Sequence, residues 1–214
     1  SVDDLLAVMV ERNASDLHLA AGSPPVIRVN GRLERLPDHE QLTPEETRTM
    51  MYRVLSTEQQ KVLETRRQID FSHSIPGLAR FRVNAYFQRA AVGAAFRLIP
   101  DHIKSLDELG LPSSLLDLTT KPRGLVLVTG PTGSGKSTTL ASMIDEINRA
   151  RTDHIITIED PIEFLHFHKS CIVNQREIGE DARGFADALR GALRQDPDVI
   201  LLGEMRDLET ISTA

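Results

Sequence analysis

The sequence predicts two domains: an α/β domain built around a phosphate-binding loop, and a smaller α+β domain before it. Residues 130–137 match the pattern G-x-x-x-x-G-K-[ST] in full. After residue 122, apolar strand-like runs alternate with segments of helical periodicity, which indicates a largely parallel sheet. Before residue 100 the strand-like runs follow one another, as in an antiparallel sheet with helices to one side. We therefore expect an α+β domain over 1–100, a linker over 101–121 and a P-loop domain over 122–214.

In the first 100 residues each expected element has its own local signal. Apolar residues recur at helical spacing behind Ser1. Asn30-Gly31 lies between two alternating runs and favours the tight turn of a hairpin. Thr43 and Ser56 each begin a capping box, and a proline follows Thr43. These signals predict a helix with Val2, Leu5, Leu6 and Met9 on its apolar face, strands over 16–19, 26–29 and 32–36, helices after Thr43 and Ser56, and strands over 69–75, 79–87 and 91–99.

The second half begins with a connector that has one short helix, capped by Ser105 with Glu108. Residues 124–129 form a continuous apolar run, which indicates a strand buried on both faces. Further signals predict a helix from Lys136 with Leu140, Met143, Ile144 and Ile147 on its apolar face, strands over 154–158, 171–174 and 199–202, a helix marked by Phe185, Leu189 and Leu193, and a helix beginning near Asp207. Because a P-loop sheet usually has more strands than these, we expect the chain to be a fragment of a longer protein.

The composition limits the classes of protein that fit. The 214 residues carry a net charge of −6, which argues against a broadly basic nucleic-acid-binding face. No run of about 18 apolar residues could span a bilayer, and the acidic N-terminus is unlike a secretory signal. Cys171 is the only cysteine, which excludes an intrachain disulfide and a thiolate metal cluster. We expect a cytoplasmic protein that does not insert into a membrane and does not bind nucleic acid.

The glycine-rich loop predicts a site for the phosphates of ATP with Mg²⁺. Its glycines let successive backbone N–H groups point inward around an anion, next to the N-terminus of a helix. Lys136 would reach the β- and γ-phosphates, the Ser137 hydroxyl would bind Mg²⁺, and Thr138 would bond the α-phosphate. The residues expected to bind nucleotide are Thr132, Gly133, Ser134, Gly135, Lys136, Ser137 and Thr138.

Two acidic elements follow expected strands. Glu204 ends the apolar run 199–202, the form of a Walker B element, and would hold Mg²⁺ through water. Asp198, at the other end of that strand, is expected to be a solvated charge. Glu159, Asp160 and Glu163 follow the strand 154–158, and one of them could orient the attacking water. The alternative for this segment is a charged loop without catalytic function.

Several segments together resemble the secretion-type ATPases, and most of all their twitching-motility branch, which retracts type IV pili. The segments are 121–162, 171–177 and 195–210, together with 14–19, 22–25 and Asn30-Gly31. The resemblance implies a RecA-like C-terminal domain, a PAS-like N-terminal domain and a homohexamer with ATP between domains and subunits. It also implies a position at the inner membrane, at the base of the pilus, with the pilus platform protein as partner.

The resemblance assigns roles to particular residues. Glu163 would be the general base, and Arg82 and Arg97 would reach the γ-phosphate, with Arg80 as a third candidate. Without the family, the alternation of Arg80 and Arg82 with apolar residues predicts only the polar face of a half-buried strand. The family's histidine box and C-terminal motif are not present, so we expect these 214 residues alone to hydrolyse ATP poorly.

Three other functions remain open: an extension or secretion ATPase of the same family, a nucleic-acid translocase, and a small-molecule kinase. A translocase would need a basic channel with aromatic platforms, whereas only 4% of residues are aromatic and none is tryptophan. No segment resembles the lid of a kinase. His166 and His168 could pair as metal ligands, but we expect surface histidines, and we expect Cys171 to be a small buried side chain.

Overall fold

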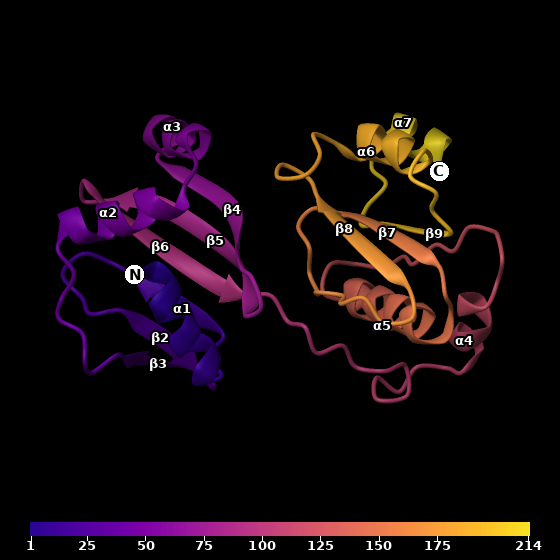
Figure 1. The fold of residues 1–214 in the computed structure, drawn as a ribbon, viewed down its shortest axis with the longest axis horizontal. Helices are drawn as coiled ribbons and strands as arrows, with labels where there is room; N and C mark the ends of the chain where they lie inside the picture. Colours follow the sequence, from indigo (N-terminus) through magenta and orange to yellow (C-terminus); the bar gives the residue numbers. More distant parts are fainter. The chain divides into compact units, whose positions relative to one another are not determined.

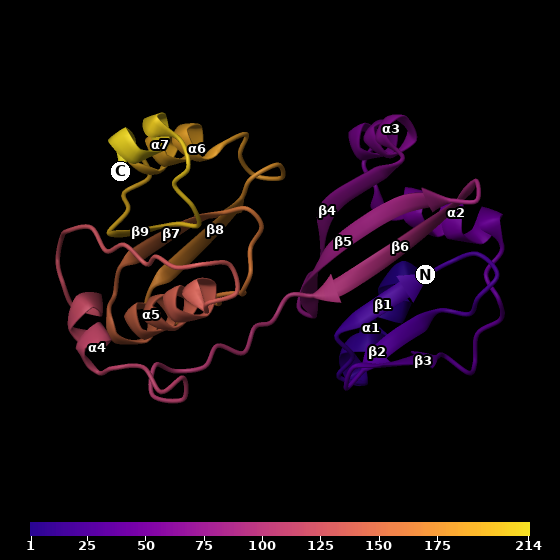
Figure 2. The same cartoon turned by 180° about the vertical axis from the view of Figure 1, so that it is seen from behind.

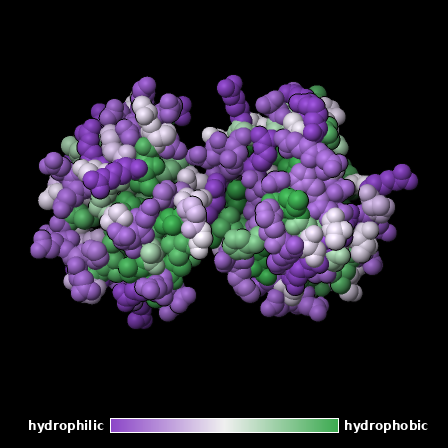
Figure 3. Space-filling model, viewed as in Figure 1, coloured by the Kyte–Doolittle hydropathy of each residue, from purple (hydrophilic) through white to green (hydrophobic).

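The computed structural model describes residues 1–214, and the chain divides into two compact units, Ser1–Ile99 and Pro100–Ala214 (Figures 1 and 2). No helix is both long enough and apolar enough to cross a membrane. On the face drawn in Figure 3, apolar and polar residues are interspersed over both units.

Three helices of the first unit begin with a capping box, two of them at the predicted capping residues Thr43 and Ser56. In α1 (Val2–Glu11), α2 (Pro44–Val54) and α3 (Thr57–Arg66), the side chains of Ser1, Thr43 and Ser56 each accept a hydrogen bond from the backbone N–H three residues on. The side chain of that third residue accepts a hydrogen bond from the backbone N–H of the cap residue, which completes a capping box in every case. The predicted helix starts are therefore confirmed.

The first unit contains a six-stranded antiparallel sheet in the order β3-β2-β1-β6-β5-β4. Its strands are β1 (Asp16–Leu19), β2 (Val26–Val29), β3 (Arg32–Arg35), β4 (Gln68–Ile75), β5 (Ala79–Gln88) and β6 (Ala91–Leu98). Asn30 and Gly31 both have positive φ, 48° and 81°, as the predicted tight turn requires. The expected hairpin and the three later strands are thus confirmed.

The two faces of this sheet differ. Alternate residues such as Leu17, Phe96 and Val83 are fully buried in a core to which α1, α2 and α3 also contribute. The residues between them point to the opposite face. There the register places Asp16 beside Arg97, and Arg97 beside Arg82. The sheet is therefore half-buried, with a charged row on its second face.

The second unit contains a three-stranded parallel sheet in the order β8-β7-β9. Its elements are α4 (Ser114–Thr119), α5 (Lys136–Ala150), β7 (His154–Glu159), β8 (Ile172–Glu177), α6 (Phe185–Ala192), β9 (Val199–Leu202) and α7 (Leu208–Thr213). Ile144 and Ile147 of α5 pack against Ile155, whereas Ala188 and Leu189 of α6 belong to a separate cluster. Figures 1 and 2 accordingly show α5 on one side of the sheet and α6 with α7 on the other. The expected helices from Lys136, around Phe185 and near Asp207 and the strands β7, β8 and β9 are confirmed, although Leu193 is an exposed cap residue.

The prediction of a buried strand over residues 124–129 is wrong. This segment forms no strand, and Leu125 and Leu127 are 65% and 60% exposed. An extended run becomes a strand only when a neighbour satisfies its N–H and C=O groups. In this structure β9 pairs with β7 on one edge only, and no strand of the chain pairs with 124–129. The apolar run therefore leads into the phosphate-binding loop as irregular chain.

The prediction of a short helix after Ser105 is also wrong, although its capping box forms. Ser105 N–H donates to Glu108, and Glu108 N–H donates to Ser105 Oγ at 3.2 Å. The chain then makes only a single turn, in which Leu109 N–H donates to Ser105 O at 3.1 Å, and Gly110 ends it with a positive φ of 66°. The segment belongs to the second unit, where Ser142 Oγ of α5 donates to Lys104 O.

Candidate nucleotide and metal site

The glycine-rich loop curls back on itself before α5 begins at Lys136. Gly133 and Gly135 have φ values of 79° and 91°, a backbone region that residues with a side chain rarely adopt. Lys136 Nζ donates hydrogen bonds of 2.8 Å to the carbonyls of Gly130 and Pro131, across the concave side of the loop. The loop thus holds its ammonium group beside the N-terminus of a 15-residue helix, where an anion is favoured.

The loop and both acidic elements meet at a cleft of about 280 Å³. From the loop and α5 the cleft receives Thr132 and Ser137, and from the end of β9 it receives Glu204. Its complete lining is Thr132, Ser137, Leu140, Ala141, Glu159, Asp160, Pro161, Glu163, Phe164, His166, Leu201, Gly203, Glu204 and Arg206. Parallel strands β7 and β9 end at the same edge of the sheet, which places their acidic residues in one cleft.

The carboxylates of this cleft have different environments. Glu159 accepts hydrogen bonds from Thr157 Oγ1 at 2.6 Å and from Gln175 Nε2 at 3.1 Å. Burial raises the pKa of Glu159, against the effect of these hydrogen bonds. Glu163 is exposed, and Glu204 pairs with Arg206 at 3.0 Å. Asp160 and Glu163 are thus the exposed carboxylates that can approach a bound molecule, while Glu159 is held in place by its neighbours.

Thr157, Gln175 and Arg206 were not predicted as neighbours of this cleft, although the first two bond Glu159 and Arg206 lines the cleft. Arg206 lies two residues beyond the Walker B glutamate, so its place beside Glu204 could have been anticipated. Gln175 comes from the middle of β8, which no sequence signal places next to Glu159. Only the parallel register, which pairs Thr157 with Gln175, brings the two side chains together.

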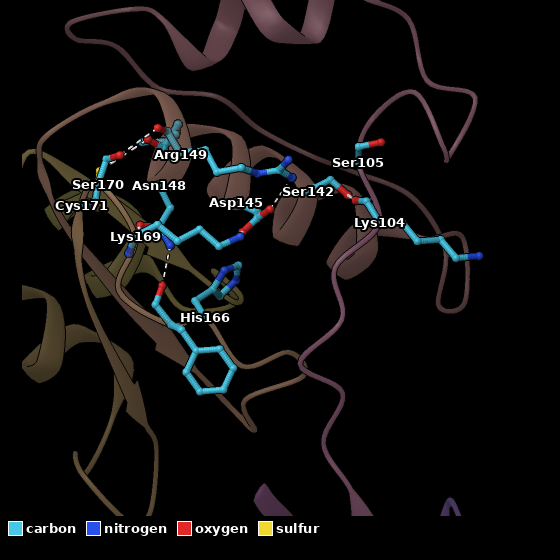
Figure 4. A network of polar contacts seen from close by, with 12 residues as sticks. Lys104, Ser105, Ser142, Asp145, Asn148, Arg149, His166, Lys169, Ser170 and Cys171 are labelled. Carbon is cyan, nitrogen blue, oxygen red and sulfur yellow. Dashed lines mark hydrogen bonds and ion pairs between the residues drawn. The ribbon is translucent and has the colours of Figure 1, made fainter. Parts of the chain in front are cut away.

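Beyond the cleft, a polar network joins the segment between β7 and β8 to α5 (Figure 4). Asp145 is almost fully buried and accepts bonds of 2.5 Å from Lys169 Nζ and Arg149. Burial opposes ionisation of Asp145, but these two cations outweigh it and hold its pKa below the ordinary value. Asn148 Nδ2 donates to Phe167 O at 2.7 Å, and Asn148 Oδ1 accepts from Lys169 N at 3.1 Å. The helix that begins in the phosphate-binding loop therefore also anchors Phe167 and Lys169, which follow the acidic segment.

The expectation of surface histidines is wrong for His166. His166 lines both the cleft and a second cavity of about 380 Å³, and its buried Nδ1 has no hydrogen-bond partner. Burial lowers the pKa of His166 to about 4. His168 Nδ1 instead accepts a bond of 3.0 Å from Val173 N. No three metal-binding side chains gather around either histidine. Cys171 is buried, as expected.

The arginines singled out in the sequence lie on the charged face of the first unit. Arg82 and Arg97 are exposed and directly opposite each other in neighbouring strands. Arg97 Nε donates to Asp16 Oδ1 at 2.9 Å, and Arg80 donates to Ser74 Oγ at 3.0 Å. Burial of Asp16 alone would raise its pKa, but bonds from Ser15 and Arg97 hold the pKa below its ordinary value. Arg97 is thus oriented by a buried carboxylate.

Comparison with known proteins identifies relatives over the whole chain. The family model described as type II/IV secretion system protein matches residues 1–214. The chain is 52% identical over 213 residues to the type IV pilus retractation ATPase PilT of Pseudomonas aeruginosa, and 46% identical over 212 residues to the type IV pilus ATPase PilU of the same organism. It covers 62% and 55% of these two relatives.

A solved structure agrees with the sequence comparison. The crystal structure of the pilus retraction motor PilT with bound ADP matches with a TM-score of 0.87 and 54% identity. The match covers 98% of this chain and 61% of the other. The chain therefore spans about three fifths of the length of the relatives it resembles.

Proposed function

Since the chain belongs to the type II/IV secretion system protein family, we propose that it forms part of an ATP-hydrolysing motor that retracts type IV pili. The observation that carries the proposal is the single cleft that gathers the phosphate-binding loop, the acidic segment after β7 and Glu204, which follows β9. The 52% identity with a retraction ATPase favours retraction over extension. We further propose the PAS-like and RecA-like assignments for the two units.

The phosphate-binding loop would make the main contacts with the phosphates of the nucleotide. The backbone N–H groups of residues 132–138 would hold the phosphates, and Lys136 would exchange its two carbonyl partners for the β- and γ-phosphates. The Ser137 hydroxyl and the Glu204 carboxylate line one cleft and are the hard oxygen donors that Mg²⁺ prefers. Bound Mg²⁺ would neutralise charge on the phosphates, with Ser137 in its coordination shell and Glu204 contacting it through water.

Glu163 is the proposed general base. A base must reach the water that attacks the γ-phosphate, and Glu163 is exposed within the cleft. Glu159 is less suited to this role, because Thr157 and Gln175 already occupy one of its oxygens. We assign Glu159 to support of the site and Glu163 to proton transfer.

The charged face of the first unit would supply cations to the γ-phosphate. Arg82 and Arg97 are exposed and side by side, and Asp16 binds Arg97 through Nε, which leaves the terminal nitrogens of Arg97 available to an anion. A guanidinium group in this role stabilises the charge of the transferred phosphoryl group. The support is the geometry within this unit together with the family resemblance.

The proposed assembly follows the family resemblance. It is a homohexamer with nucleotide between domains and subunits, placed at the cytoplasmic side of the inner membrane and acting on the pilus platform protein. The negative net charge of −6 argues against a nucleic-acid translocase.

The first test is Glu163→Gln in the full-length protein, which removes the base and keeps the size of the side chain. We expect hydrolysis of Mg-ATP to fall about 10²- to 10⁴-fold while nucleotide binding is retained. Glu180→Gln, an exposed carboxylate outside the cleft, serves as the matched control. Wild-type turnover in Glu163→Gln would remove Glu163 from the mechanism.

A further inference from the structure

The segment that carries Glu163 is bonded to the side chain of Gln175 on β8. Gln175 Nε2 donates to Phe164 O at 2.8 Å and to Glu159 Oε2 at 3.1 Å. Gln175 Oε1 accepts from the backbone N–H of His166 at 2.8 Å. One side chain thus makes three hydrogen bonds, two of them to the backbone just after Glu163.

A second side chain of β8 holds the segment on the other side of Glu163. Glu177 Oε1 accepts from the backbone N–H of Ile162 at 3.0 Å, and Glu177 is only 3% exposed. Ile162 is itself buried, so its N–H depends on this acceptor. The backbone is therefore fixed at residues 162, 164 and 166, which bracket Glu163 closely.

The residue types suit these contacts. Gln175 and Glu177 are two residues apart on a strand and so point to the same face of the sheet. The register places them beside Thr157 and Glu159, respectively. At position 175 the side chain must donate to a carbonyl and a carboxylate and also accept from an N–H, which an amide can do and a carboxylate or hydrocarbon cannot. At position 177 the side chain must accept from the N–H of Ile162, which a carboxylate can do.

We propose that Gln175 and Glu177 are positioning residues that set the place of Glu163 in the nucleotide cleft. Neither side chain lines that cleft, so both act through the segment 162–166. The inference rests on the proposed function, in which Glu163 is the general base. A base displaced by about 1 Å can cost about 100-fold in rate, so loss of the Gln175 bonds is expected to affect catalysis more than binding.

The test compares Gln175→Leu and Gln175→Glu with Asn174→Ala in the full-length protein. Asn174 is exposed, points to the other face of β8 and bonds His154, away from the segment. Gln175→Glu keeps the acceptor for His166 N–H but sets a second oxygen against Phe164 O and Glu159. Mg-ATP turnover at saturation, ATP affinity and the midpoint of thermal unfolding are measured for each variant.

We expect both Gln175 variants to lose about 100-fold in kcat with ATP affinity unchanged, whereas Asn174→Ala keeps wild-type turnover. If Gln175 only stabilised the fold, its replacement would lower the midpoint of thermal unfolding and would not lower kcat selectively over ATP affinity. Combination of Gln175→Leu with Glu163→Gln should lower kcat no further than Glu163→Gln alone, because the two changes remove one function.

The experiment distinguishes failure of the positioning role of Gln175 from failure of Glu163 as the base. If both Gln175 variants turn over ATP like Asn174→Ala, the positioning role is refuted while the role of Glu163 stands. The same holds if Gln175→Leu lowers kcat by a further 100-fold or so in the Glu163→Gln protein. If Gln175→Leu does not fold, Gln175→Glu decides, and if neither folds the residue is structural. If Glu163→Gln alone keeps wild-type turnover, the proposed base and this inference both fail.

Discussion

Replacement of His166 by phenylalanine should change how the stability of the second unit depends on pH. His166 is half-buried and lines both the nucleotide cleft and the second cavity, and its buried Nδ1 has no hydrogen-bond partner. Burial is the main cause that lowers its pKa from 6.5 to about 4, and Lys169 on its own segment adds to the effect. Asp145 on α5 opposes the shift. Phenylalanine has a similar shape and does not titrate.

The direction of the pH dependence follows from the difference in proton binding by His166 between the native and the unfolded state. Above pH 6.5 the imidazole is neutral in both states, so it adds no pH dependence. As the pH falls from 6.5 to about 4, the unfolded chain binds a proton that the native protein does not, and the native protein loses stability. Below about pH 4 the loss is complete, at about 3 kcal/mol for the difference between the two pKa values. This loss is absent in His166→Phe.

The assay is urea unfolding of both proteins at several pH values between 7 and 4, followed by far-ultraviolet circular dichroism. Other groups titrate in the same range, so the informative quantity is the difference in unfolding free energy between variant and wild type. At pH 7 this difference should be small, because the variant removes a buried polar atom that had no partner. As the pH falls towards 4, the unfolding free energy of the variant should rise by about 3 kcal/mol relative to that of the wild type. A difference that stays constant with pH would refute a buried neutral histidine.

Three further changes have defined outcomes. Arg82→Ala should lower ATP turnover about 10³- to 10⁵-fold while leaving nucleotide binding intact, and a turnover assay beside a binding titration checks it. Asp145→Ala removes the acceptor shared by Arg149 and Lys169, which are half-exposed and can rehydrate, so urea unfolding should show a loss of about 1–3 kcal/mol. Gly31→Val forces a branched residue to a φ of 81°, and calorimetry should record a loss of about 1–2 kcal/mol, whereas no change would contradict the turn assignment.

The parts of the fold that follow from local chemistry could be predicted from sequence. A capping box needs only two residues three apart, and those begun by Thr43 and Ser56 form as expected. The start of α5 likewise follows from the glycine-rich loop before Lys136. The acidic residues that line the cleft were anticipated because parallel strands end at one edge of the sheet.

The parts that depend on distant neighbours could not be predicted. The apolar run 124–129 looks like a strand, but its state depends on whether another strand pairs with it, and hydrophobicity does not record this. His166 stands between Leu165 and Phe167 in a segment without helical or strand periodicity, and its position depends on contacts of the following residues with Asn148 and Asp145 of α5. The three hydrogen bonds of Gln175 depend in the same way on the register of β7 and β8.

Every role proposed for the cleft requires that the phosphate-binding loop binds Mg-ATP, which titration calorimetry of the full-length protein and of Lys136→Ala measures. We expect the wild type to bind Mg-ATP and Lys136→Ala to bind it about 10- to 100-fold more weakly, because a charge-assisted contact to the phosphates is removed. A folded wild-type protein that does not bind Mg-ATP, or a Lys136→Ala protein that binds it equally well, would contradict the account.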